Sequence, residues 1–381
     1  MAEVYIAECR TYEEERVKEA MSELLQKSGL LSFVRPDMTI GIKANLVSFM
    51  KPEAAATTHP TVLKVLCDML TDRGAKCIIG DSPGGLYNSV FVGRVYSATG
   101  MKSLESERVS LNRNFGQKTA DFPEAMVAKT FEYTAWLDEC DAVINFCKLK
   151  THGMMGLSAA AKNLFGIVPG TIKPEYHFRF PDHKDFARMI VDLNEFLKPE
   201  LSICDAVVGM EGNGPTAGTP REIGCLIASA SPHKLDLVCA EIIGIKPETL
   251  PILEAAKERG LIEGGFDTLD VSGDVEKFKI PDYERIETHT SLDFKGKNNI
   301  LGTVMGNIVG SVLASKPKLK KSECVGCKEC MKICPAKAIV MSGGKPKINR
   351  KECIRCFCCQ EFCPKGALKV KRPLIAKILN K

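Results

Sequence analysis

The sequence predicts an α/β protein in which a large domain built on a mostly parallel sheet precedes a small cysteine-rich domain. Two observations predict this architecture. Strand-like and helix-like segments alternate over residues 1–290, as they do where helices connect parallel strands. Nine of the 17 cysteines then lie between Cys324 and Cys363, inside a segment that repeats itself.

The elements of the large domain are expected where the apolar pattern has a period of two or of 3.6 residues. Short apolar runs predict strands at 4–7, 39–43, 77–80, 142–146, 206–209 and 226–228. Amphipathic segments predict helices at 13–27, 60–73, 157–165, 186–197 and 234–243. Pro60 and Gly74 bracket the second of these helices, in the order that helix ends favour.

The domain boundaries follow changes in composition. We expect the large domain at 1–294 and a linker at 295–322, which is rich in Gly, Asn and Lys at its ends and has a packed apolar turn at 308–313. The small domain follows at 323–372, and residues 373–381 form a basic tail.

The composition is that of a globular chain: 381 residues, 45% hydrophobic and 26% charged. It excludes a disordered, collagen-like or coiled-coil protein. No run of 18 apolar residues is present and the N-terminus lacks a basic-then-apolar leader, so we expect no membrane span and no membrane partner. Eight scattered cysteines with apolar neighbours favour a reducing compartment, which we take to be the cytoplasm.

An internal repeat dominates the small domain. Residues 323–339 read ECVGCKECMKICPAKAI and residues 352–368 read ECIRCFCCQEFCPKGAL, offset by 29 residues. Each copy contains C-x2-C-x2-C-x3-C-P. Three close cysteines wrap one face of a cubane cluster, and the fourth thiolate comes from the other copy. The repeat therefore predicts two [4Fe-4S] clusters, with Cys324, Cys327, Cys330 and Cys363 on one and Cys353, Cys356, Cys359 and Cys334 on the other.

Zinc sites and disulfides are the rival explanations of these cysteines. Zinc sites pair C-x2-C units at longer separation and do not produce a triplet followed by Cys-Pro, and disulfides conflict with the expected compartment. The segment resembles the bacterial two-cluster ferredoxins over residues 322–372, which implies a small pseudo-twofold domain that relays single electrons. Cys358 is additional to the motif and is either a bystander thiol or a residue with a ligand or redox role.

The C-terminal segment is strongly basic. Residues 316–381 contain 18 Lys+Arg and 4 Asp+Glu, a net charge of +14, whereas the whole chain carries +5 and residues 1–315 carry −9. Two oxidised clusters lower the charge only to about +10. A basic tail is one sign of nucleic-acid binding, which we do not expect here. The charge favours docking to the acidic large domain or to an acidic electron-transfer protein, a ferredoxin or flavodoxin.

Polar residues follow four of the predicted strands, at the edge where open α/β sheets bind ligands. Two more segments are expected to close over this edge: one contains His59, and the other is a small-residue helix. Lysines and histidines placed against acids suit a small anionic ligand with proton transfer or a metal. The residues concerned are Lys43, Asn45, His59, Asp81, Lys148, Lys150, His152, Lys162, Asn163, Glu211 and Asn213.

Several of these residues also have a structural explanation: helix cap, solvated loop cation, turn brace or loop packing. A helix cap is the explanation for His59, and a solvated loop cation is the explanation for Lys148 and Lys150. A turn brace is the explanation for Asp81, Glu211 and Asn213, and loop packing is the explanation for the nearby His177 and His183. No Walker sequence is present, and GNGPTAG is not followed by a clear helix, so neither flavin nor nicotinamide binding is indicated.

Six strings carry a family resemblance: IGIKANL, ATTHP, GDSPGG, INFCKLKTH, GLSAAAKNLFG and MEGNGP. Together they resemble the family of domain of unknown function 362 over residues 1–290, a family without an established reaction that is often fused to a two-cluster ferredoxin module. KTHGMMGLSAAAKNLFGIVPG is more distantly similar to the cofactor segment of the nickel-pincer lactate racemase fold. That similarity implies a cofactor-bearing role for Lys162 and a histidine role for His152.

We therefore predict an iron–sulfur oxidoreductase whose clusters relay electrons to or from an anionic small molecule or cofactor in the α/β domain. His152 is expected to act in acid/base chemistry, and Lys43 and Lys162 to contact the anion. The expected catalytic residues are His152, Lys162, Asp81 and Glu211, and the expected binding residues are Lys43, Asn45, His59, Lys150 and Asn163.

Two alternatives remain open. One is a non-redox isomerase or racemase with structural clusters. The other is an assembly or electron-carrier protein that loads metal, cofactor or electrons onto a partner protein. Turnover that depends on a reductant separates the first alternative from the prediction, and stable complex formation without turnover supports the second.

Overall fold

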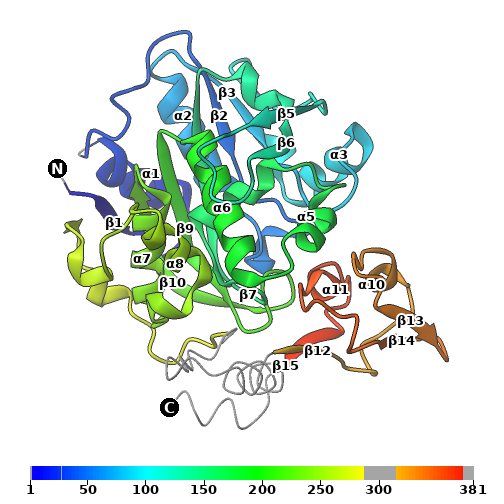
Figure 1. The fold of residues 1–381 in the computed structure, drawn as a ribbon. Coiled ribbons are helices and arrows are strands. Elements are labelled where there is room, and N and C mark those ends of the chain that lie inside the picture. The colour runs from blue at the N-terminus through cyan, green and yellow to red at the C-terminus, as the bar shows by residue number, and fades with distance from the viewer. Residues whose placement is uncertain (1, 27, 287–314, 372–381) are drawn as a thin grey trace.

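The computed structural model describes residues 2–26, 28–286 and 315–371. It contains a large α/β domain and a small C-terminal domain that lies against one edge of the large domain's sheet (Figure 1). Within the described residues, no helix is long and apolar enough to cross a membrane.

One nine-stranded sheet forms the centre of the large domain. Its order is β11 (Val271–Ser272), β1 (Val4–Glu8), β10 (Thr219–Ser229), β9 (Leu201–Glu211), β7 (Ala142–His152), β2 (Thr39–Lys43), β3 (Lys76–Gly80) and β4 (Val109–Leu111), with β8 (Gly156–Ser158) paired to β7. The run β9-β7-β2-β3-β4 is parallel, whereas β10 is antiparallel to both its neighbours. The predicted mostly parallel α/β sheet is confirmed.

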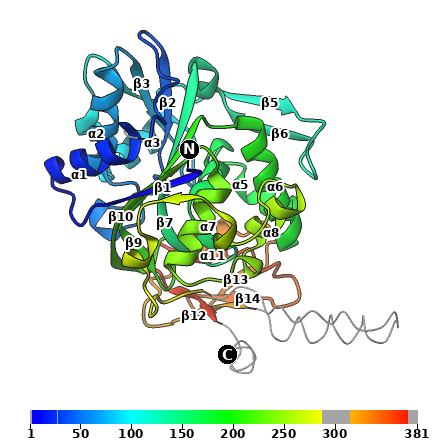
Figure 2. The same cartoon turned by 90° about the vertical axis from the view of Figure 1, so that its left-hand side faces the viewer.

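Helices cover both faces of this sheet (Figure 2). One face packs against α1 (Glu14–Met21), α2 (Pro60–Thr71) and α3 (Ser89–Ala98). The other packs against α4 (Ala160–Asn163), α5 (Lys173–Arg179), α6 (His183–Leu197), α7 (Pro232–Ile242) and α8 (Pro251–Glu258). A separate hairpin of β5 (Gln117–Asp121) and β6 (Thr130–Thr134) lies beside the sheet.

Local side chains explain where several helices begin. Asn88, Asp182 and Ser231 each accept a backbone N–H of the first turn of α3, α6 and α7, which satisfies donors that a helix end leaves open. His59 does the same for α2, where Pro60 occupies the first position. The cap predicted as the alternative role of His59 is therefore present.

Strands β7 and β9 are longer than the sequence pattern suggested. The expected strand 142–146 continues to His152, and the expected strand 206–209 spans Leu201–Glu211. Both pair on two sides, β7 also with the short β8. The backbone pairing therefore extends through polar residues that read as a loop. The expected helix 157–165 is instead β8, the four-residue α4 and a 3-10 turn.

The small domain consists of two similar halves. Its strands pair as β12 (Lys316–Leu319) with β15 (Leu368–Lys371) and β13 (Ile339–Ser342) with β14 (Lys345–Ile348). Short helices α10 (Glu329–Lys332) and α11 (Cys358–Glu361) each follow a residue with positive φ, Lys328 and Phe357, at the offset of the sequence repeat. The small cysteine-rich ferredoxin-like domain is thus present.

The expected boundaries compare with the structure only in part. Strand β12 lies inside the expected linker 295–322 and pairs with β15, so Lys316–Leu319 belongs to the small domain. The rest of the expected linker up to residue 314, with its apolar turn, and the tail 373–381 lie outside the described residues.

Candidate functional site

A cleft opens at the carboxyl edge of the sheet, between the two domains. Its walls come from the ends of β2, β3 and β7, from α4 and α5, and from α11 of the small domain. The chain passes from β2 to β3 on one side and later returns to β7 on the other. The cleft therefore lies at the switch point where open α/β sheets bind ligands. Its polar lining includes Asn45, Asp81, Ser82, Lys150, His152, Ser158, Lys162, Asn163, Lys173, His177 and Glu361.

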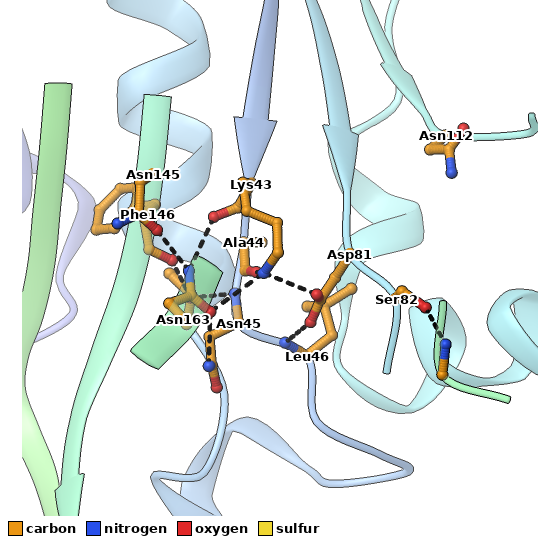
Figure 3. Close-up of polar contacts among 12 residues, drawn as sticks. Lys43, Ala44, Asn45, Leu46, Asp81, Ser82, Asn112, Asn145, Phe146 and Asn163 are labelled. Carbon is orange, nitrogen blue, oxygen red and sulfur yellow. Dashed lines mark hydrogen bonds and ion pairs between the residues drawn. The ribbon is translucent and has the colours of Figure 1, made fainter. Parts of the chain in front are cut away.

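A buried ion pair lies at the base of the cleft, where β2 and β3 end (Figure 3). Lys43 Nζ lies 2.7 Å from Asp81 Oδ1, and both side chains are at most 5% exposed. Asp81 Oδ2 also accepts the Leu46 backbone N–H at 2.8 Å. Gly166 leaves the space that the pair needs, because a Cβ there would meet both side chains at 2.4 Å. This pair joins the loops after β2 and β3 and does not present a free charge.

Asn163 connects that ion pair to β7. Its amide donates to Asn145 Oδ1 at 2.8 Å and to the Lys43 carbonyl at 3.2 Å. Its oxygen accepts from Asn45 Nδ2 at 2.8 Å and from Lys43 Nζ at 3.2 Å. Lys43 and Asn163 were expected to contact a ligand, but their polar atoms are largely satisfied within the protein (Figure 3).

Lys150 is fixed by two neutral acceptors. Its Nζ donates to Asn45 Oδ1 and to the Ala56 carbonyl, each at 2.7 Å, and the side chain is buried. Burial lowers its pKa to about 7, and nearby Glu361 opposes the shift only in part. Lys150 therefore changes its charge near neutral pH.

Two more lysines face the cleft over the ring of Phe165. Lys173 donates to the Ser82 carbonyl, and burial lowers its pKa to about 8. Lys162 Nζ lies 4.7 Å from the Phe165 ring centroid and makes no hydrogen bond or ion pair with any other described residue. Burial also lowers the pKa of Lys162, and Glu361 opposes the shift. The cleft thus gathers three lysines, of which Lys162 is the least satisfied.

His152 is held in one protonation state by the backbone. Its Nδ1 accepts the amide N–H groups of Met154 and Met155, both at 3.1 Å, so the ring proton is on Nε2. Nε2 is buried and has no partner among the described residues. Burial and the nearby Lys162 hold the pKa of His152 well below its usual value. The ring is therefore a neutral N–H donor at neutral pH.

His177 is a second neutral imidazole in the cleft wall. It stacks on Phe186 with a centroid distance of 4.3 Å, and its Nδ1 is buried without a partner in the part of the chain that the structure describes. Burial lowers its pKa to about 3. The packing predicted as its alternative role is present, and the ring also lines the cleft.

Three residues expected at this site lie elsewhere. His59 stacks on Tyr12 at 3.6 Å and caps α2. Lys148 lies two residues before Lys150 on β7, but its ammonium group pairs with the buried Asp205 carboxylate at 2.9 Å. Glu211 accepts the Glu284 backbone N–H at 3.0 Å and lies 3.7 Å from Arg221. None of the three lines the cleft.

The Gly-Asn-Gly-Pro loop after β9 holds the small domain. Gln360 of α11 donates to the carbonyls of Asn213 and Gly214 at 3.0 and 2.9 Å. Thr216 donates to the Glu361 carbonyl at 2.9 Å, and Asn213 Oδ1 accepts the Val370 N–H at 3.2 Å. The loop therefore positions α11 over the cleft, where Cys358, Glu361 and Phe362 form the opposite wall.

The cysteines group across the two repeats. Cys324, Cys327, Cys330 and Cys363 line one small cavity of the small domain. Burial raises the pKa of the Cys359 thiol, and thiols of both halves, Cys356, Cys353, Cys334 and Cys330, add to this rise. The halves match in detail, since Cys334 and Cys363 each accept the N–H four residues later, at 3.3 and 3.2 Å. No three His, Cys, Asp or Glu side chains in the described ranges are placed to hold one metal ion. The four thiols that line one cavity fit a cubane cluster, and the repeated sequence places the other four at the same spacing.

Sequence reasoning missed Lys173 and the α11 wall. Lys173 stands in a segment without a strong helical pattern, at the start of α5, and no strand end precedes it. Cys358, Glu361 and Phe362 belong to the cysteine repeat, so no local signal connects them with the sheet edge. Only the contact between the domains brings these residues to the cleft.

Comparison with known proteins gives two matches along the chain. Residues 40–241 match the family described as Domain of unknown function (DUF362). Residues 316–364 match the 4Fe-4S dicluster domain. These two segments coincide with most of the central sheet and with the repeat of the small domain.

Two individual proteins are similar to the chain. Thylakoid-associated protein sll1697 of Synechocystis sp. is 30% identical over 261 residues, which cover 68% of this chain and 79% of that protein. The lactate racemase apoprotein of Thermoanaerobacterium thermosaccharolyticum matches with a TM-score of 0.37 and 13% identity. That match covers 58% of this chain and 54% of the other, so this chain spans about half its length.

Proposed function

The chain belongs to the DUF362 family and carries a C-terminal 4Fe-4S dicluster domain, and from this premise we propose that it is an iron–sulfur oxidoreductase acting on a small anion. The anion binds in the cleft of the α/β domain. One observation carries the proposal: α11, which belongs to the cysteine repeat, and the three lysines of the α/β domain line the same cleft. A bound anion would therefore touch both domains.

The two [4Fe-4S] clusters of the dicluster domain supply single-electron transfer when bound. We assign Cys324, Cys327, Cys330 and Cys363 to the first cluster site and Cys353, Cys356, Cys359 and Cys334 to the second. The first site is nearer to solvent, because Cys327 is exposed. The second is nearer to the cleft, because Cys358 and Glu361 flank its ligands Cys356 and Cys359 and line the cleft wall.

Lysines of the cleft supply the positive charge that binds the anion. Lys162 is the direct contact, because its ammonium group has no other partner in the described residues. Lys150 and Lys173 add charge below their lowered pKa values of about 7 and 8. Lys43, Asp81 and the Asn45–Asn163 amides hold the loops in place, so we assign these residues a bracing role in place of the expected contact or catalytic roles.

His152 is a hydrogen-bond donor in this proposal and not an acid. Nδ1 accepts hydrogen bonds from two backbone N–H groups, and a proton on Nδ1 would point directly at both of them. The ring therefore stays neutral and directs Nε2–H into the cleft. Such a donor stabilises negative charge that develops on a ligand oxygen. Lys150 is better suited to proton transfer, because its pKa lies near the working pH. His59 and Glu211 receive structural roles.

The electron partner we propose is an acidic carrier, a ferredoxin or flavodoxin. The basic charge of residues 316–381 supports this choice. The compartment we propose is the cytoplasm, because all described cysteines are free thiols, and Cys204 and Cys239 remain unbonded with sulfurs 3.9 Å apart. Free thiols of this kind are typical of reducing compartments.

The test is reoxidation of the reduced protein. Electrochemically reduced, anaerobic protein is mixed with a panel of small carboxylates, sulfonates and phosphates that each carry a reducible carbonyl group or activated double bond, and cluster absorbance is followed over time. We expect one chemical class to reoxidise the protein with saturable kinetics, and Lys162→Met to remove the saturation. Slow, non-saturable reoxidation by every anion, unchanged in Lys162→Met, would contradict the proposal. Turnover without any change of cluster absorbance would favour the isomerase alternative.

A further inference from the structure

Cys358, the cysteine outside the ligand motif, occupies a defined position between the two halves of the site. It begins α11, is 1% exposed and lines the cleft. Along the chain it lies two residues after Cys356 and directly before Cys359, both of which we assign to the second cluster. Lys162 lines the same cleft from the α/β domain. Cys358 therefore stands between the ligands of the second cluster and the cleft that contains the anion-binding lysine.

On the facing wall of the cleft, the Asp81 carboxylate is already paired with Lys43. Lys162 has no ion-pair partner among the described residues, and His152 Nε2 is buried in the same cleft without an acceptor. Glu361 is the carboxylate that α11 contributes to this wall. An anion in the cleft would therefore sit between cationic groups of the α/β domain and the sulfur of Cys358.

We propose that anion binding in the cleft and reduction of the second cluster are coupled across the α11 wall, where Cys358 adjoins the ligands of that cluster and lines the cleft, so that each weakens the other. The inference rests on the proposed function for the place of the anion. Reduction adds one negative charge to the cluster site, and charges separated by a buried contact are weakly screened. Since coupling is reciprocal, a bound anion makes the second cluster harder to reduce by the same factor.

The coupling has a size that can be measured. Couplings between protein sites are commonly fivefold or more in affinity, and we expect at least about fivefold weaker anion binding after reduction. For a one-electron couple a tenfold change in affinity corresponds to a shift of about 59 mV. The second cluster should shift more than the first, because Cys358, which directly precedes its ligand Cys359, lines the cleft. The consequence is a site that holds its anion more weakly when the second cluster is reduced.

The experiment uses sulfate, which is redox-inert and keeps its charge. Calorimetry measures sulfate binding to the intact holoprotein, oxidised and electrochemically reduced, and an EPR-monitored redox titration with and without sulfate resolves the two clusters. We expect weaker binding on reduction and a larger fall in potential for the second cluster than for the first. Equal affinity in both redox states, or equal shifts of both clusters, would overturn the coupling. Failure of sulfate to bind the oxidised protein would instead count against the proposed anion site.

Four variants locate the coupling. Lys162→Met should lose sulfate binding and its effect on the potential, whereas Lys347→Met, which removes an exposed lysine of β14, should keep both. Cys358→Ala should lower the potential of the second cluster by removing the polar S–H group that adjoins its ligands Cys356 and Cys359, and Cys358→Ser should restore it. An unchanged potential in Cys358→Ala, or loss of a cluster from that variant, would overturn the role of Cys358.

Discussion

At the scale of single residues, the lysines at one sheet edge have different roles because their interaction partners differ. Lys43 is buried against Asp81 at 2.7 Å, whereas Lys162 lies over an aromatic ring without an acid beside it. Removing one partner of a buried pair leaves an uncompensated charge, which is far more costly than removing an unpaired cation. The two residues should therefore respond differently to the same substitution.

We predict that Lys43→Met lowers the free energy of unfolding of the α/β domain by about 3–5 kcal/mol, because Asp81 is left buried and unpaired. Lys162→Met should change it little and weaken anion binding instead. The single tryptophan, Trp136, reports on this domain alone, since it packs against Gly41 and Gly80 of β2 and β3. Denaturant unfolding followed by its fluorescence measures both variants, and equal destabilisation would show that Lys162 is also structural.

The pH dependence of anion binding follows from Lys150 and Lys173. Burial lowers their pKa values to about 7 and 8, so both are charged at pH 6 and neutral at pH 9. His152 and His177 have lowered pKa values and stay neutral throughout. Sulfate affinity should therefore fall as the pH rises from 6 to 9, by at least about tenfold, since hydrogen bonds to charged groups contribute roughly 1.5–3 kcal/mol each. Affinity that is constant or rises with pH would contradict this assignment.

At the scale of elements, the apolar patterns located the buried strands but not their ends. Strand β2 matches its expected bounds because polar residues and turns flank it. In β7 the lysines and His152 alternate with apolar residues after an apolar run, and only pairing with β8 and β9 decides that the strand continues. The polar residues at the strand ends could be identified from the sequence, because ligands bind beyond the carboxyl ends of parallel strands and the order of strands and helices locates those ends.

The rest of the site could not be predicted, because contacts distant in sequence create it. Asn213 was expected at a ligand site, yet its loop holds α11 through Gln360. Lys148 and Lys150 occupy equivalent positions in the pattern, yet Asp205 pairs only with Lys148. The repeat predicted both clusters, because the spacing of the cysteine ligands can be seen within a short stretch of the chain.

The repeat leads to a prediction about iron content. Anaerobically prepared protein should contain about eight irons and eight sulfides per chain, as two cubanes require. Cys358→Ala should leave the iron content unchanged, because each four-thiol set is complete without Cys358. Iron and sulfide analysis with metal quantification checks both statements. Saturation at four irons, or with zinc, would refute the ligand assignment.

At the scale of the whole molecule, charge is divided between the domains. Residues 1–315 carry −9 and residues 316–381 carry +14. The exposed ligand Cys327 and the exposed side chain of Val325 lie in the basic domain, away from the α11 wall. This arrangement gives an acidic carrier a basic surface at the first cluster while the second faces the cleft.

The rate of reduction by an acidic carrier should therefore depend on salt. Between 0.01 and 0.15 M ionic strength the screening length falls from about 30 Å to about 8 Å, so stopped-flow reduction by a ferredoxin or flavodoxin should slow clearly. Changing the exposed lysines Lys318, Lys321 and Lys328 to Glu should slow reduction at low salt and flatten the dependence. A reduction rate that changes neither with salt concentration nor with these substitutions would exclude electrostatic docking.

The central claim is that an anion in the lysine cleft lies in contact with the second cluster site. The most direct test is phosphorus electron–nuclear double resonance on the reduced protein at saturating inorganic phosphate. We predict a phosphorus coupling to the unpaired electron of the second cluster in the wild type and in Lys347→Met, and its loss in Lys162→Met. Phosphate binding without any phosphorus coupling, or a coupling that survives in Lys162→Met, would contradict the account.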